Sequence, residues 1–207
     1  NLVIVSGGGK ELGGDRVELE TEIRQMGEEH AGRGIGPNCI GVFDGPTRLD
    51  TFFQTHERML RPEAGPVGML TQSGTVGAAL LEDAAVAGLG VSKFVSYGNR
   101  VDVDEADLLR YLSEDPETDI IVLYVEGFED GRKFLRVARE VAQAKPVIIF
   151  KVGRTQQAAR ASMSHTGFLG GSFEVARGAF RQAGLIAVDS YEALFSAAKA
   201  LSKQPPA

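Results

Sequence analysis

His165 is the residue of this sequence best placed to do chemistry. It lies in the stretch SHTGFLGGS (164–172), among hydroxyl side chains and glycines. A histidine that only fills a core is more often surrounded by large apolar residues, so this imidazole is expected to be accessible to a ligand. A neutral imidazole can act as a nucleophile or carry a proton. The alternative is a histidine in a glycine-rich surface loop with no chemical role.

Glu126 is a second candidate, because it ends the strand-like run DIIVLYVE (119–126) and precedes a glycine. A carboxylate that accepts a hydrogen bond from one ring nitrogen of a histidine fixes its tautomer and leaves the other nitrogen as a nucleophile. The alternative is an acidic residue that favours the positive end of the following helix. Glu129 and Asp130 already lie at that helix start, so Glu126 is the residue predicted to pair with His165.

A phosphate site is predicted in LTQSGTVG (70–77), where a strand-like run gives way to a helix-like run. Ser73 can cap this helix, and Gly74 allows the backbone to turn. The free N–H groups of the first helical turn lie at the positive end of the helix dipole and bind phosphoryl oxygens. A capped turn without a ligand has the same pattern and is the alternative.

The stretch GIGPNC (34–39) combines turn-forming residues with a carboxamide and the only thiol of the chain. It is either a simple turn or a loop that approaches a ligand through its backbone and Asn38. No metal site is predicted, because one cysteine and three histidines show no paired ligand spacing. The acidic run DVDEAD (102–107) lacks the glycine and the glutamate of a calcium loop and is expected to begin a helix.

Alternating strand-like and helix-like runs must bring these residues together. From residue 66 onward, five apolar runs are each followed by an amphipathic run; the predicted strands are 66–72, 92–97, 119–126, 146–150 and 185–188. The predicted helices are 74–88, about 104–113, about 130–143, a helix from about 173, and a last helix marked by apolar residues between 194 and 201. This pattern predicts an α/β fold with a parallel sheet covered on both faces. Five such units favour the flavodoxin-like strand order 2-1-3-4-5, in which strands 1, 3 and 4 are neighbours.

The part of the chain before residue 66 is less regular. The run LVIVS (2–6) is a predicted strand, and the helix-like stretch after it has Leu19, Ile23 and Met26 on one face. A short strand is expected within 33–42. Residues 43–65 show no period and are predicted to be a linker or an edge segment.

Composition excludes some classes of function. The 207 residues carry a net charge of −6 and no basic tract, so nucleic acid is not an expected partner. No apolar run reaches the length of a membrane helix, and no membrane partner is expected. A single cysteine excludes an internal disulfide and fits a cytoplasmic protein. Because the chain opens at Asn1 directly with a strand-like run, we expect it to be a piece of a longer protein.

Together these stretches resemble the nucleoside-diphosphate-forming acyl-CoA synthetases, the superfamily of succinyl-CoA synthetase and ADP-forming acetyl-CoA synthetase. The stretches that carry the resemblance are GPNCIGV, TQSGTVGAALLEDA, VSYGNRVDVDEADLLRYLSEDPET, YVEGFEDGRKFL and KVGRTQQAARASMSHTGFLGGS. They follow the family's order and spacing, and SHTG is closer to the acetate–CoA ligase branch than to the succinate branch.

The resemblance implies a role for each candidate residue. It implies that His165 is phosphorylated, that Glu126 positions it, and that a phosphoryl group passes through this histidine between an acyl phosphate and a nucleotide. The implied phosphate-binding residues are Ser73, Gly74, Thr75 and Gly167. The implied residues near CoA and the acyl group are Gly36, Pro37, Asn38 and Cys39. Phe168 stands where a small residue is expected in the family.

The resemblance also implies how the chain is divided and what it works with. Residues 1–45 would be the C-terminal part of a Rossmann-like CoA-binding domain, 46–65 a linker, and 66–203 a flavodoxin-like domain that carries the phosphohistidine. The substrates would be CoA, a small carboxylic acid and phosphate. ATP or ADP with Mg²⁺ would be bound by an ATP-grasp domain or partner subunit outside this chain, and the assembly would be an oligomer.

Two other functions stay open at this point. One is a regulatory ligand-binding module of a synthetase-like protein fused to an acetyltransferase. The other is a flavin-binding flavodoxin-like domain, which is disfavoured because no tryptophan or tyrosine lies near the loops that would hold the flavin ring.

Overall fold

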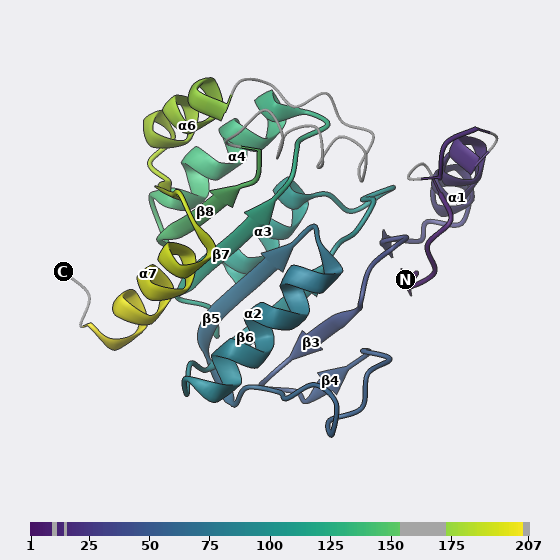
Figure 1. The fold of residues 1–207 in the computed structure, drawn as a ribbon. Helices are drawn as coiled ribbons and strands as arrows, with labels where there is room; N and C mark the ends of the chain where they lie inside the picture. The colour runs from purple at the N-terminus through teal and green to yellow at the C-terminus, as the bar shows by residue number, and fades with distance from the viewer. Residues whose placement is uncertain (10–11, 15, 154–172, 205–207) are drawn as a thin grey trace.

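The computed structural model describes residues 1–9, 12–14, 16–153 and 173–204. Its main body is a seven-stranded sheet in the order β4-β3-β6-β5-β7-β8-β9 (Figure 1). The five parallel strands are β5 (Ala64–Thr71), β6 (Val91–Ser96), β7 (Ile120–Val125), β8 (Val147–Lys151) and β9 (Ile186–Val188). Numbered among themselves, they lie in the predicted order 2-1-3-4-5.

Helices cover both faces of the parallel strands, as predicted. One face is covered by α2 (Gly74–Val86) and α7 (Tyr191–Lys203). The other is covered by α3 (Glu105–Glu114), α4 (Gly131–Ala142) and α6 (Phe173–Gln182).

The central strand β7 shows why its sequence is apolar without a break. Ile121, Leu123 and Val125 pack into the cluster under α3, α4 and α6. Ile120, Val122 and Tyr124 pack into the cluster under α2 and α7. Because successive side chains of a strand point to opposite faces, a strand buried on both faces needs apolar residues at every position.

Two short antiparallel strands extend the sheet beyond β6. They are β3 (Val42–Asp44), which pairs with β6, and β4 (Leu49–Asp50). Residues 43–65 were predicted to be a linker or an edge segment, and the edge alternative is confirmed where β3 and β4 lie at one edge of the sheet. The strands themselves were not predicted, because two or three residues are too few to show a period. The loop that follows is packed, with the Phe52 ring 5.4 Å from that of Phe94. The division of the chain at residues 45/46 and 65/66 stays a prediction.

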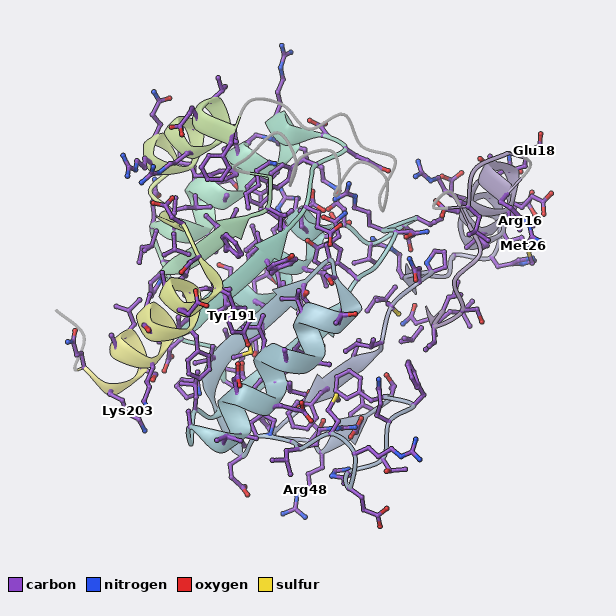
Figure 2. All side chains as sticks on the ribbon, in the orientation of Figure 1. Arg16, Glu18, Met26, Arg48, Tyr191 and Lys203 are labelled. Carbon is purple, nitrogen blue, oxygen red and sulfur yellow. The ribbon has the colours of Figure 1, made fainter. Side chains whose placement is uncertain are left out.

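The first residues form a separate small unit beside the sheet (Figure 1). Strand β1 (Leu2–Val3) pairs in parallel with β2 (Gly34–Ile35), and α1 (Arg16–Glu29) lies between them in the chain. Leu19 and Met26, predicted to lie on one apolar face of this helix, are 42% and 60% exposed. Figure 2 labels Met26 on α1. The apolar face of α1 is therefore not buried against the sheet. No helix in the described ranges is both long and apolar enough to cross a membrane.

Candidate functional site

A cavity of about 290 Å³ lies at the carboxyl edge of the sheet. Its lining residues are Val5, Asn38, Cys39, Ile40, Phe53, Gln72, Ser73, Gly74, Thr75, Gly98, Asn99 and Glu126. Three of the four candidate stretches thus meet at one place, because the carboxyl ends of parallel strands share one edge of a sheet. His165 and Gly167, like Phe168, lie outside the described residues.

Glu126 directly follows β7 and is half-buried at the cavity. Tyr124 is affected by the negative charge of Glu126. Burial raises the pKa of the Tyr124 phenol, and repulsion from the Glu126 carboxylate raises it further, to about 12. Glu126 is not the residue that caps α4. Asp130 caps α4 instead, and its side chain accepts hydrogen bonds from the backbone N–H groups of Arg132 and Lys133. This assignment of Asp130 to the helix start was predicted.

The start of α2 is the capped turn predicted from the sequence, and anion binding there stays a prediction. Ser73 is the N-cap, and its Oγ accepts a hydrogen bond from the backbone N of Val76 at 3.4 Å. Thr71 Oγ1 donates to the Ser73 carbonyl at 2.7 Å and holds the turn. A Cβ on Gly74 would lie 2.7 Å from Ile40 Cγ2, so glycine allows the helix start to pack on Ile40, directly after the 36–39 loop. The first N–H groups of a helix have no acceptor within the helix and can bind an anion.

The loop that carries Gly36, Pro37 and Asn38 is anchored by Asn99, which follows β6. The backbone N of Asn99 donates to the Pro37 carbonyl at 2.9 Å, and Asn38 Nδ2 donates to Asn99 Oδ1 at 3.3 Å. Asn99 Nδ2 in turn donates to the buried Glu20 Oε1 at 2.6 Å. Helix α1 is thereby connected to the cavity through two amide side chains. Sequence reasoning missed Asn99 and Glu20, because they are 79 residues apart and no local pattern relates them.

Cys39 lines the cavity, but its thiol is tied to the protein. The side chain is 4% exposed, and Sγ donates to the Ile4 carbonyl at 3.3 Å. Burial raises the pKa of this thiol, so it is protonated at neutral pH. This state fits a packing role at the cavity wall and not that of a nucleophile.

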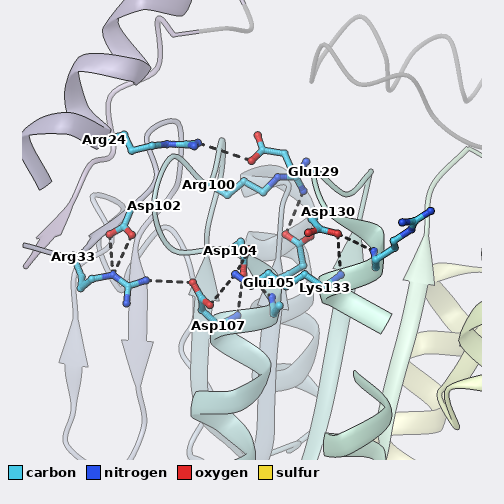
Figure 3. Close-up of polar contacts among 12 residues, drawn as sticks. Arg24, Arg33, Arg100, Asp102, Asp104, Glu105, Asp107, Glu129, Asp130 and Lys133 are labelled. Atoms are coloured by element: carbon cyan, nitrogen blue, oxygen red, sulfur yellow. Dashed lines mark hydrogen bonds and ion pairs between the residues drawn. The ribbon is translucent and has the colours of Figure 1, made fainter. Parts of the chain in front are cut away.

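The acidic run 102–107 begins α3, as predicted, and it also carries ion pairs (Figure 3). Asp104 is the N-cap of this helix. Arg33 pairs with Asp102 at 3.0 Å and with Asp107 at 3.2 Å, and Lys133 pairs with Asp104 at 2.7 Å. The Arg33 contacts join the N-terminal unit to the start of α3, and the Lys133 contact joins α4 to the same helix start. In the described ranges, no three His, Cys, Asp or Glu side chains are grouped so that they could hold a metal ion.

A mostly parallel sheet with helices on both faces, and a cavity at its carboxyl edge beside a helix N-terminus, defines a flavodoxin-like α/β domain. Residues 64–201 match the family model described as the succinyl-CoA ligase like flavodoxin domain. The chain belongs to this family.

Two similar relatives are ADP-forming CoA ligases. The chain is 44% identical over 201 residues to acetate–CoA ligase [ADP-forming] I of Archaeoglobus fulgidus. This match covers 97% of this chain and 29% of that protein. It is 37% identical over 208 residues to 4-hydroxybutyrate–CoA ligase [ADP-forming] of Nitrosopumilus maritimus. This match covers 99% of this chain and 29% of that protein.

A solved structure is also similar. The dinucleotide forming acetyl-coenzyme A synthetase 1 of Candidatus Korarchaeum cryptofilum, in complex with phosphate and ADP, has a TM-score of 0.90 and 38% identity. The match covers 99% of this chain and 44% of that one. The chain therefore spans less than half the length of the relatives that it matches.

Proposed function

We propose that this chain is the phosphohistidine-bearing part of an NDP-forming acyl-CoA synthetase. The complete protein would interconvert acyl-CoA, NDP and phosphate with a carboxylic acid, CoA and NTP. The observation that carries this proposal is that one cavity is lined by Glu126, by the first residues of α2, and by Asn38 and Cys39 of the 36–39 loop. An anion site, a carboxylate and a substrate-side loop are the parts that a phosphoryl relay requires at one place.

The reaction divides into three transfers. Phosphate attacks the acyl carbon of acyl-CoA; a carbon–oxygen bond forms, the carbon–sulfur bond breaks, and CoA leaves. A ring nitrogen of His165 then attacks the phosphorus of the acyl phosphate, and the carboxylic acid leaves as its carboxylate. The phosphohistidine finally transfers its phosphoryl group to NDP, which restores the imidazole.

The residues of this chain would support these transfers by charge and hydrogen bonding. Glu126 would accept a hydrogen bond from the second ring nitrogen of His165 and stabilise the positive charge that the ring gains. Ser73, Gly74 and Thr75, together with Gly167, would bind the phosphoryl oxygens through backbone N–H groups and the helix dipole. Asn38 would face CoA and the acyl group from the other side of the cavity.

The remaining parts of the reaction would be supplied outside this chain. Residues 1–45 would complete a CoA-binding domain, which is supported by the exposed apolar side chains of Leu2, Leu19 and Met26. An ATP-grasp domain or subunit would bind the nucleotide and Mg²⁺. We infer that the complete protein is a cytoplasmic oligomer that acts on a small carboxylic acid.

The test is phosphorylation of His165 in the complete protein, with its partner subunit if there is one. After incubation with ATP and Mg²⁺, phosphopeptide mass spectrometry under mildly basic conditions should find phosphate on His165, and acid with CoA should remove it. The variant His165→Ala should lose turnover, whereas His30→Ala, which alters an exposed histidine at the end of α1, should keep it. A wild-type protein that binds CoA but takes no phosphate would refute the proposal.

Glu126→Gln tests the carboxylate separately. The amide keeps the size of the side chain but removes its charge, so we expect His165 phosphorylation to slow by about 100-fold without disappearing. An unchanged rate would remove Glu126 from the mechanism.

A further inference from the structure

Gln72 lies between the end of β5 and the turn that follows β7. It is 8% exposed and lines the cavity between Glu126 and Ser73. Its backbone N donates to the Tyr124 carbonyl at 3.2 Å, which continues the β5–β7 pairing by one residue. The position of Gln72 is therefore determined by the sheet and not by a loop.

The side chain of Gln72 binds the backbone of the candidate carboxylate residue. Its Oε1 accepts hydrogen bonds from the backbone N of Glu126 at 2.9 Å and from the backbone N of Gly127 at 3.3 Å. Strand β7 ends at Val125, so these two N–H groups come directly after the strand. One amide oxygen thus binds both N–H groups at the point where the chain turns into the cavity.

A second side chain reaches the same turn from the opposite neighbouring strand. Lys151 ends β8 and is largely buried, and its Nζ lies 3.5 Å from the Glu126 carbonyl and 3.0 Å from the Val152 carbonyl. Glu126 is therefore held through its N–H by β5 and through its carbonyl by β8. A backbone held on both sides leaves its side chain few directions.

We propose that Gln72 is a positioning residue, which holds Glu126 in the direction that the phosphohistidine reaction needs. This inference rests on the proposed function and adds to it a residue that acts only through Glu126. A neutral amide suits the role, because its oxygen accepts two N–H groups without placing a second negative charge beside the Glu126 carboxylate.

The predicted effect of removing this acceptor is a slower phosphoryl transfer. Gln72→Met keeps the length and volume of the side chain but leaves the two N–H groups without their acceptor. A small displacement of a catalytic group costs up to about 100-fold in rate, so we expect the rate of His165 phosphorylation to fall by about 10- to 100-fold. CoA affinity should not change.

A double-mutant cycle separates positioning from a general structural effect. The complete protein is compared as wild type, Gln72→Met, Glu126→Gln and the double variant, and the rate of His165 phosphorylation by ATP and Mg²⁺ is followed by rapid quench. If Gln72 acts through Glu126, the double variant is no slower than Glu126→Gln alone. The inference would be overturned if the fold-losses in rate of the two single variants multiply in the double variant. A wild-type phosphorylation rate in Gln72→Met would also overturn it.

A matched control uses Lys145, whose side chain likewise makes two hydrogen bonds to backbone groups. Its Nζ donates to the Leu112 and Asp115 carbonyls at 2.8 and 2.7 Å. These bonds lie at the opposite edge of the sheet, so Lys145→Met should lower stability and leave the phosphorylation rate unchanged. A comparable loss of rate in this control would assign the effect of Gln72→Met to stability and overturn the inference.

A second variant keeps the test decisive if Gln72→Met folds poorly. Gln72→Glu retains an acceptor for both N–H groups but places a second negative charge beside the Glu126 carboxylate. The pH–rate profile of His165 phosphorylation should therefore differ from that of the wild type, and an unchanged profile would count against the inference. Absence of phosphate on His165 in the wild type would overturn both proposals, whereas a phosphorylated wild type with an unaffected Gln72→Met would overturn only this one.

Discussion

Gly98→Ala is expected to displace the 36–39 loop from the cavity. Gly98 has φ +54°, and a Cβ there would lie 2.2 Å from the Pro37 carbonyl oxygen and 2.4 Å from the Asn38 carbonyl oxygen. Both neighbours are backbone atoms, so no side-chain rotation can relieve the contact. The loop and the turn after β6 must move apart for alanine to fit.

The size of the effect follows from two separate contributions. A left-handed conformation costs a non-glycine residue about 1–2 kcal/mol wherever it occurs. At Gly98 the carbonyl oxygens must also retreat by about 1 Å, and a displacement of that size in a site can cost about 100-fold in rate. Gly88 isolates the first contribution, because it has φ +62° and nothing within 4 Å of a Cβ.

The assay compares Gly98→Ala and Gly88→Ala in the complete protein by denaturant unfolding and by acyl-CoA turnover. Both variants should lose stability, with Gly88→Ala limited to about 1–2 kcal/mol. Only Gly98→Ala should lose turnover, by about 100-fold. Equal turnover in the two variants would show that the 36–39 loop does not need its position at the cavity, and the reasoning would fail.

Three further predictions concern buried ionisable groups. Lys93 Nζ lies 3.5 Å from Asp44 and 3.4 Å from Asp115, so Lys93→Met should destabilise the protein by about 3 kcal/mol in urea unfolding; a loss below about 1 kcal/mol would contradict a stabilising role. Burial opposes ionisation of Asp115, but hydrogen bonds from Thr118 and Lys93 hold the pKa of Asp115 below its usual value. The Asp115 carboxylate therefore binds a proton more readily in the unfolded state than in the folded state. The stability difference between wild type and Asp115→Asn should be present above about pH 4 and should shrink as the pH falls through the lowered pKa of Asp115. Cys39 should resist iodoacetamide at neutral pH until the protein unfolds, as peptide mass spectrometry can measure; rapid labelling of the folded protein would refute its buried, protonated state.

The sequence alone was enough for the α/β class, the five parallel strands and their order. Apolar runs and helical spacing are local patterns. They predict strands and helices because the apolar residues that form the pattern are the ones buried in the core. Caps are local too, so the helix starts at Ser73, Asp104 and Asp130 could be located from residue type. The parallel order implies that the ends of strands 1, 3 and 4 lie together, which places Glu126 near Ser73 on sequence grounds.

Other features of the site depended on the tertiary structure. Gln72 was part of a quoted motif, but only the pairing of β5 with β7 shows that its amide binds the backbone of Glu126. Asn99 could not be linked to Glu20 or Asn38 from sequence, because these contacts join the N-terminal unit to the turn after β6. Hydrogen bonds between distant residues depend on the path of the whole chain, and no local propensity encodes them.

The same limit applies to the N-terminal unit. Its helix was predicted from spacing, yet the spacing says only that Leu19 and Met26 share a face and not what covers that face. The sequence determined the elements and the side chains that could do chemistry, because these depend on neighbours along the chain. The tertiary structure decided which of those side chains meet at the cavity and what holds them there, because that depends on neighbours in space.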